Sequence, residues 1–125
     1  DVDITKLLAF HEKMGRKATM TVVQPAGRFG TAEIEAGCVR TFREKVDSDS
    51  GWINGGFLVL EPSVLPYLKG DETILEQEPL STLAAEGELA AYQHRGFWQC
   101  MDTLRDKEKL EQLWKEGAPW RIWEK

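Results

Sequence analysis

Apolar and polar residues repeat along the chain with two different periods, which predict helices and strands in turn. Residues 3–14 carry apolar side chains at helical spacing, and Asp3 and Gly15 are suited to cap the two ends of that helix. Residues 103–116 show the same spacing behind Thr103, a second capping residue. Two amphipathic helices are therefore predicted, one near each end of the chain.

Strands are predicted where β-branched and apolar residues cluster between turn residues. The predicted strands are 18–24, 31–35, 38–43, 52–60 and 89–94. Ala36-Gly37 predicts a hairpin turn, and the apolar run 52–60 predicts a strand buried on both faces. Two short helices are expected at 63–68 and 73–86, the second interrupted at Pro79. Because helices and strands interleave, the predicted class is α/β.

Length and net charge limit the classes of protein to which this chain can belong. A chain of 125 residues allows one domain, 1–125, and its 42% hydrophobic residues can bury a modest core. The net charge of −5 argues against a nucleic-acid binder, so an anionic ligand would need local positive charge or a metal ion. No apolar run approaches the roughly 18 residues that span a bilayer. Cys38 and Cys100 lack metal-ligand spacing and are interpreted as reduced thiols of a cytosolic protein.

The histidines and tryptophans suggest structure more than chemistry. His11 lies within the apolar stripe of the first helix, which favours a hydrogen-bonded core histidine over a catalytic one. His94 ends a predicted strand without a visible partner. Four tryptophans are interpreted as core or interface residues: Trp52, Trp114, Trp120 and Trp123.

Three sets of residues at predicted strand ends suggest a ligand site. The acid–base pair Glu44-Lys45 ends one strand, and Asn54-Gly55-Gly56 opens the next. Asp102 stands at a strand–helix turn, where a nucleotide enzyme can hold a metal ion. Together they indicate a site for an anionic ligand rich in hydroxyl groups. Taken singly, each has a plainer explanation: solvated charges, a strand bulge, and the N-terminal Asp of a helix.

Several segments together resemble the C-terminal half of the sugar-nucleotide pyrophosphorylases. The matching stretches are 1–4, 25–30, 42–45, 52–57, 77–80, 96–107 and 118–120. The run Phe97-Trp98-Gln99-Cys100-Met101-Asp102-Thr103 is the most specific of them. The nearest members transfer a cytidylyl group from CTP to glucose 1-phosphate, giving CDP-glucose and pyrophosphate. The resemblance implies a partial, Rossmann-like nucleotidyltransferase fold. It implies a mixed, mostly parallel sheet with flanking helices, without the N-terminal half that binds the nucleotide.

The resemblance also implies a role for each candidate residue. Asp102 would be one ligand of the Mg²⁺ cofactor, because Mg²⁺ prefers carboxylate oxygens and neutralises the meeting phosphates. Lys45 would bind the sugar phosphate as a point charge, and Glu44 would accept hydrogen bonds from sugar hydroxyls. Other substrate-binding candidates are Gly30, Asn54, Gly55 and Trp98. Val46 departs from the proline usual in the family after Glu-Lys, which weakens the case for an identical loop.

Alternatives remain open at this point. A sister enzyme using UTP or dTTP, or a non-catalytic binding or assembly module, would carry similar residues. The Gly-rich loop and the first metal-binding Asp of the family have no counterpart in this sequence, so the chain alone is expected to be inactive. The resemblance further implies a cytoplasmic homo-oligomer of sugar-nucleotide and O-antigen lipopolysaccharide biosynthesis. The tail around Trp120 and Trp123 is a candidate subunit contact.

Overall fold

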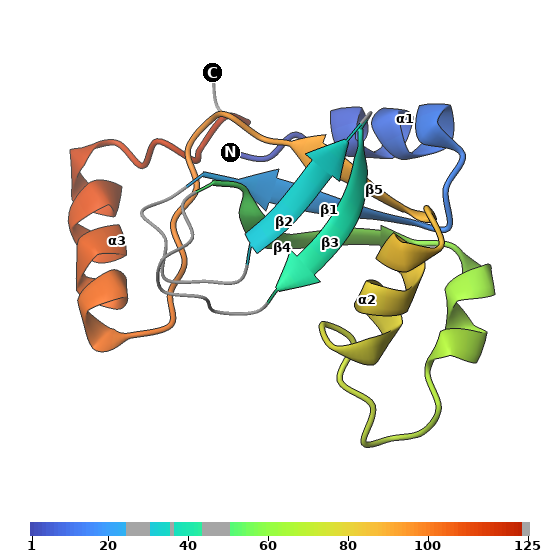
Figure 1. The fold of residues 1–125 in the computed structure, drawn as a ribbon. Helices are drawn as coiled ribbons and strands as arrows, with labels where there is room; N and C mark the ends of the chain where they lie inside the picture. Colours follow the sequence, from blue (N-terminus) through green and yellow to red (C-terminus); the bar gives the residue numbers. More distant parts are fainter. Residues whose placement is uncertain (25–30, 36, 44–50, 124–125) are drawn as a thin grey trace.

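The computed structural model describes residues 1–24, 31–35, 37–43 and 51–123. These residues form a mixed α/β arrangement in which helices flank a small sheet, as the sequence predicts (Figure 1). The strands are β1 (Ala18–Val23), β2 (Thr31–Glu35), β3 (Cys38–Arg43), β4 (Ile53–Leu60) and β5 (Leu89–Gln93). The helices are α1 (Ile4–Met14), α2 (Glu78–Ala85) and α3 (Leu104–Glu116), with a 3₁₀ helix at Pro62–Tyr67.

The strands close into a small barrel in the order β1-β4-β2-β3-β5. β1 is central, pairing antiparallel with β4 and parallel with β5. The β2–β3 hairpin lies across these strands and joins each edge through a single residue pair, Thr31 with Ile53 and Cys38 with Ala90 (Figure 1). The mixed sheet is confirmed. Its expected mostly parallel character is wrong for the described strands, because only the β1–β5 ladder is parallel.

Strand register gathers several strand ends at one end of the sheet, hereafter the open end. Val23 pairs with Ile53, Ile53 with Thr31, and Thr31 with Arg43. β5 also finishes there, since Val22 pairs with Gln93. The last residues of β1, β3 and β5 therefore meet the first residues of β2 and β4. Loops that leave this end can contribute side chains to a common site.

The core lies between the sheet and α2. Ala18, Met20 and Val22 alternate along one face of β1 and pack with Leu80 and Leu83 of α2. α1 covers the other face, where its buried Leu7 and His11 point inward. The cap at Asp3 is confirmed by the bond from the Lys6 amide to its side chain, and the left-handed Gly15 closes the helix.

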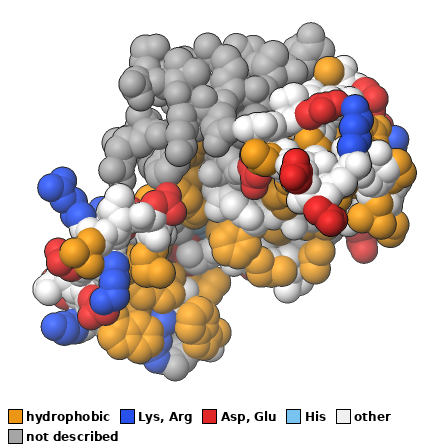
Figure 2. Space-filling model, turned by 90° about the horizontal axis from the view of Figure 1, so that it is seen from below, with side chains coloured by type: hydrophobic (Ala, Val, Ile, Leu, Met, Phe, Trp, Pro, Cys, Tyr) orange, Lys and Arg blue, Asp and Glu red, His pale blue; other side chains and the backbone are white. Residues whose placement is uncertain are grey.

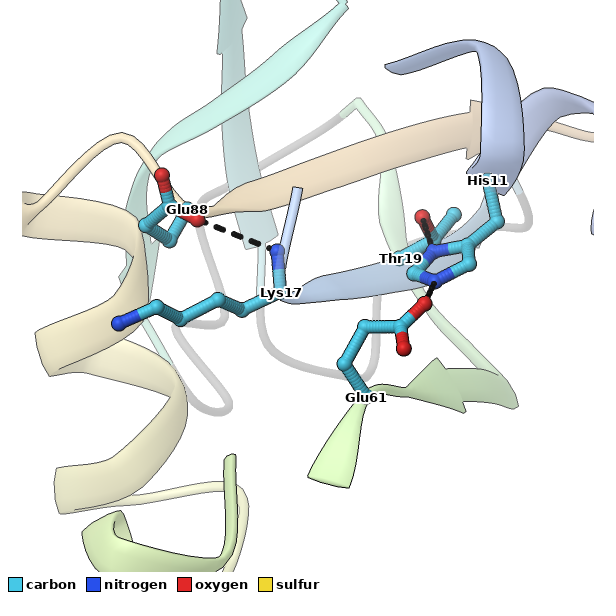
Figure 3. Close-up of polar contacts among 5 residues, drawn as sticks. All are labelled: His11, Lys17, Thr19, Glu61 and Glu88. Atoms are coloured by element: carbon cyan, nitrogen blue, oxygen red, sulfur yellow. Dashed lines mark hydrogen bonds and ion pairs between the residues drawn. The ribbon is translucent and has the colours of Figure 1, made fainter. Parts of the chain in front are cut away.

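At the opposite end, hereafter the closed end, polar side chains satisfy one another (Figure 3). His11 Nδ1 lies 2.7 Å from Thr19 Oγ1, and its Nε2 lies 2.6 Å from Glu61 Oε1. The backbone amide of Lys17 donates to Glu88 Oε2 at 3.2 Å. His11 is thus the hydrogen-bonded core histidine that the sequence predicts. These contacts tie α1 to β1, to the end of β4 and to the start of β5.

Three elements differ from prediction. β4 is not buried on both faces, because only its first residues are deeply buried while Phe57 is 43% exposed. α2 begins at Glu78 rather than near residue 73, since Pro79 is tolerated only in the first turn. α3 forms as predicted, but its apolar stripe is not covered by the described residues: Leu104 is 70% and Trp114 54% exposed. Hydrophobic groups accordingly show at the end of the molecule that carries α3 (Figure 2).

Candidate functional site

A pocket of about 270 Å³ opens at the open end of the sheet. Its lining comes from the ends of β1 and β5, the start of β4 and the segment that follows β5: Val23, Gln24, Trp52, His94, Arg95, Gly96 and Trp98. The mouths of β-barrels are common ligand sites, because segments that leave several strands converge there. The volume lies just below the usual range for ligand sites, about 300–1,000 Å³.

Two predicted site residues meet at this pocket. The indole Nε1 of Trp98 donates to the carbonyl oxygen of Gly55 at 2.9 Å. A Cβ added at Gly55 would lie 3.1 Å from Val23 Cγ1 and 3.2 Å from the carbonyl oxygen of Thr21. Glycine is thus needed here for close packing. Its backbone anchors the ring of Trp98, which lines the pocket.

Asn54 has a local structural role. Its side-chain Oδ1 accepts from the amide of Gly56 at 2.8 Å, and Gly56 has a φ of 92° that favours glycine. This turn interrupts the regular strand geometry, as the plainer interpretation of Asn-Gly-Gly anticipates. Asn54 is partly exposed and does not line the pocket. Its remaining amide protons can still donate to a ligand at the open end.

Trp52 and Arg95 form a stacked pair on the pocket wall. The guanidinium carbon of Arg95 lies 5.1 Å from the ring centroid of Trp52, within the range of cation–π attraction. The other cationic candidate in the lining, His94, is already held: its Nε2 lies 2.9 Å from Asp1 Oδ1 and 3.0 Å from the Phe97 carbonyl oxygen. The sequence shows no partner for His94, and it favours a core or interface role for Trp52, which also lines the pocket.

Asp102 lies beyond the pocket lining, at the exposed turn before α3. It lies four positions after Trp98 in the sequence, a span of at most about 14 Å when extended. The helix cap is Thr103, whose side chain accepts from the Asp106 amide, and Asp106 Oδ2 accepts in return from the amides of Asp102 and Thr103. The capping role that offered a plainer explanation for Asp102 therefore belongs to its neighbours.

The electrostatics of this turn separate the two aspartates. Desolvation acts to raise the pKa of Asp106, but hydrogen bonds from the Asp102 backbone, Thr103 and Cys100 outweigh it, so the pKa lies below its ordinary value. Burial, followed by the bond to Asp106, raises the pKa of the Cys100 thiol. Cys100 and Cys38 are free thiols, as predicted. Asp106 is committed to structure, whereas the Asp102 carboxylate faces solvent.

In this turn, Asp102 is the exposed carboxylate that a metal ion could bind, because Asp106 already accepts backbone hydrogen bonds. Within the described ranges, no group of three His, Cys, Asp or Glu side chains is placed to hold a metal. Mg²⁺ is commonly bound by one or two carboxylates together with substrate phosphates and water. An exposed, uncommitted Asp102 fits that kind of ion, which bridges substrates, and does not fit a closed protein cage.

The predicted residues Gly30, Glu44 and Lys45 lie outside the described residues. Their sequence neighbours Thr31 and Arg43 pair with each other at the open end. Sequence reasoning missed Gln24, Trp52, His94 and Arg95 as pocket residues. A signal was available for Trp52 and Arg95, since each directly adjoins or opens a stretch of the resemblance, 52–57 and 96–107.

Comparisons with known proteins agree with the resemblance. No protein-family profile matches the chain. The glucose-1-phosphate cytidylyltransferase of Salmonella typhi is 56% identical over 125 residues, which is 99% of this chain and 49% of that protein. The mannose-1-phosphate guanylyltransferase catalytic subunit beta of Drosophila pseudoobscura pseudoobscura is 32% identical over 114 residues, 88% of this chain and 30% of that protein. The chain thus spans about half the length of its cytidylyltransferase relatives.

Solved structures show the same fold. A protein assigned as a glucose-1-phosphate thymidylyltransferase from Bacillus anthracis, solved with sucrose, matches with a TM-score of 0.69. The match covers 90% of this chain and 49% of that one at 18% identity. HddC from Yersinia pseudotuberculosis matches with a TM-score of 0.69, covering 86% of this chain and 48% of that one at 19% identity. Over the half of their length that it spans, the chain is similar in sequence to the glucose-1-phosphate cytidylyltransferases.

Proposed function

We propose that the protein takes part in cytidylyl transfer from CTP to glucose 1-phosphate, giving CDP-glucose and pyrophosphate, with this chain supplying the sugar-phosphate side of the site. One observation carries the proposal. The hydrogen bond between Trp98 and Gly55 joins two stretches of the family resemblance, 96–107 and 52–57, at one pocket. The 56% identity to cytidylyltransferases over the whole chain favours CTP over UTP or dTTP.

The chemistry needs positioning and charge neutralisation more than acid–base catalysis. An oxygen of the sugar phosphate attacks the α-phosphorus of CTP in line, and pyrophosphate leaves. The open end of the sheet would hold the sugar against Trp98 and the Gly55 backbone. Lys45 would hold the sugar phosphate, and Glu44 would accept hydrogen bonds from sugar hydroxyls. Glycine at position 30 would allow the sugar to approach the backbone closely, and Asn54 would donate through its amide.

Asp102 is the proposed contribution of this chain to a Mg²⁺ site. When bound, the ion would neutralise the phosphates of both substrates, which otherwise repel each other. The proposal is supported by the exposed, non-capping carboxylate of Asp102 next to a helix that Thr103 and Asp106 cap. The phosphates and further carboxylates outside the described residues would complete the ligand set.

Pyrophosphate release tests the proposed function directly. The complete gene product should release pyrophosphate with glucose 1-phosphate and CTP, and much more slowly with UTP, dTTP or GTP. Activity with another nucleotide in place of CTP would show that the protein is a related enzyme with a different nucleotide specificity. Absence of release with all four nucleotides and Mg²⁺ would instead favour a binding or assembly module.

Asp102→Asn should lower kcat by about 100-fold or more, because asparagine keeps the shape but removes the charge that holds the ion. The melting temperature should be unchanged, since Thr103 and Asp106 cap α3. Asp71→Asn, a similarly exposed aspartate in a distant turn, is the matched control and should retain full activity. A near-normal kcat in Asp102→Asn would show that Asp102 is an ordinary surface residue with no role in metal binding.

Lys45→Ala and Glu44→Ala should differ in what they disturb. Loss of one charged hydrogen bond costs on the order of 1.5–3 kcal/mol, a factor of roughly 10 to 150 in kcat/KM. Lys45→Ala should weaken all sugar phosphates about equally. Glu44→Ala should lose preference between glucose 1-phosphate and the epimer at the hydroxyl it contacts. Wild-type kcat/KM and sugar preference in both variants would show that the pair is only a solvated strand end.

The proposal also covers the oligomeric state of the protein and its location in the cell. We propose a cytoplasmic homo-oligomer that supplies sugar nucleotides for O-antigen lipopolysaccharide. The exposure of Ile122 (42%) and Trp123 (69%) supports a subunit contact at the tail. Light scattering on the complete gene product would show a mass of one subunit if this is wrong. Among the described residues, no helix is both long and apolar enough to cross a membrane.

A further inference from the structure

Among the described residues that line the pocket at the open end, Arg95 is a cation that forms no ion pair with another described residue. Arg95 lines the pocket and is exposed. Among the described residues, no carboxylate lies within ion-pair distance of its guanidinium, whereas Arg16 at the closed end lies 4.0 Å from Glu88. With no acidic partner among the residues that the structure describes, this guanidinium can meet an anion that enters the pocket.

The contact with Trp52 orients Arg95 without using its donors. The guanidinium carbon lies over the Trp52 ring at 5.1 Å from its centroid, and a cation–π contact of this kind uses the positive charge without consuming an N–H group in a hydrogen bond. Trp52 is itself held, because it is partly buried and packs against the core cluster of β1 and α2. The side chain of Arg95 thus loses less conformational freedom when an anion binds than a freely rotating arginine would.

The ligand that this geometry suits is a phosphate monoester. The edge of a guanidinium presents two parallel N–H groups that match two oxygens of one phosphate. The adjoining wall is formed by Trp98, whose flat apolar ring suits the C–H face of a sugar. His94 cannot supply the same charge freely, since Asp1 Oδ1 and the Phe97 carbonyl oxygen already surround its Nε2.

We infer that Arg95, oriented by Trp52, is a substrate-positioning residue that binds the phosphate of the sugar 1-phosphate through the edge of its guanidinium. This role rests on the proposed function and adds to it a second cation for the same phosphate, besides the proposed Lys45. Trp52 acts through Arg95 and does not touch the phosphate.

Two measurements on the complete gene product test the inference. The first is steady-state kinetics with each substrate varied in turn. Arg95→Ala should raise the KM for glucose 1-phosphate by about tenfold or more and leave the KM for CTP within twofold. Arg95→Lys should recover part of the loss, because it keeps the charge but not the paired donors. Trp52→Leu should raise the same KM by a smaller factor. Arg16→Ala, at the closed end, is the matched control and should leave both KM values unchanged.

The second measurement is a tryptophan-fluorescence titration, which needs no turnover. The wild-type protein should bind glucose 1-phosphate more tightly than glucose, and Arg95→Ala should lose most of that difference. An Arg95→Ala variant that keeps the wild-type preference and KM values overturns the inference while the proposed function stands. A wild-type protein that neither reacts with nor binds glucose 1-phosphate overturns both. Equal losses for CTP and the sugar phosphate would indicate a general structural effect and would also contradict the positioning role.

Discussion

The two ends of the sheet differ in how far their polar side chains are satisfied by other protein groups. At the closed end, His11, Thr19 and Glu61 satisfy one another within 2.7 Å (Figure 3). At the open end, Arg95 stacks on Trp52 beside a pocket and meets no carboxylate among the described residues. A buried polar group without a partner costs free energy, so the closed end must be self-satisfied. Exposed polar side chains at the open end are solvated by water and carry no such penalty, so their hydrogen-bond donors can remain available for a ligand.

The same contrast recurs within the turn before α3. The carboxylate of Asp106 accepts from the amides of both Asp102 and Thr103, whereas that of Asp102 faces solvent. Neighbouring residues of one type thus divide into a structural and an available member. Hydrogen-bond satisfaction, more than residue type, separates structural polar groups from candidate functional ones in this protein. Three predictions test that distinction, beginning with the largest expected effect.

Thr19→Val should destabilise the protein by about 1–3 kcal/mol, because it leaves the buried His11 Nδ1 without its partner. Thr21, two residues along the same strand, is the matched control: it is equally buried, but its Oγ1 has no hydrogen-bond partner among the described residues. Thr21→Val should therefore be neutral or stabilising. Urea denaturation measures both changes. Equal losses of unfolding free energy in the two variants would mean that the hydrogen bond between Thr19 and His11 does not contribute to stability.

Gly55→Ala should cost about 1–2 kcal/mol, since the new Cβ would press on a methyl of Val23 and on the Thr21 carbonyl oxygen. It should also weaken the bond from Trp98 and hence alter tryptophan fluorescence at the pocket. Gly70→Ala is the control, because no heavy atom lies within 4 Å of the added Cβ. That variant should stay within about 0.5 kcal/mol of wild type. If Gly55→Ala leaves both the free energy of unfolding and the tryptophan fluorescence unchanged, close packing at Gly55 does not position Trp98 at the pocket.

The smallest effect concerns acid sensitivity of the turn before α3. The pKa of Asp106 is lower in the folded state than in the unfolded chain, so its stabilisation is complete above about pH 4 and is lost as pH falls through the folded pKa. An NMR titration of side-chain carboxyl shifts should place the Asp106 midpoint below 3.9, the ordinary value for aspartate. Asp106→Asn should remove this part of the acid dependence of α3 helicity, whereas Asp102→Asn should preserve it. A midpoint at or above the ordinary value would contradict the capping assignment.

Local interactions allowed the sequence to determine most of the secondary structure. Asp3, Gly15 and Thr103 mark helix ends because caps depend on residues within one turn, and all three are confirmed. The hairpin at Gly37 and the core role of His11 followed from equally local patterns. The position of Gly55 and Asp102 at predicted strand ends indicated them as site residues, whereas Trp98 was indicated only by the family resemblance.

Only the tertiary structure decided which of these residues meet. The bond from Trp98 to Gly55 spans 43 positions, and the stacking of Arg95 on Trp52 joins the segment after β5 to the start of β4. Such contacts follow from strand order and register, which are set by burial of the whole sheet and by no local pattern. The exposed stripe of α3 was missed for the same reason: periodicity shows that a helix has an apolar face, but burial of that face depends on what the rest of the fold places beside it.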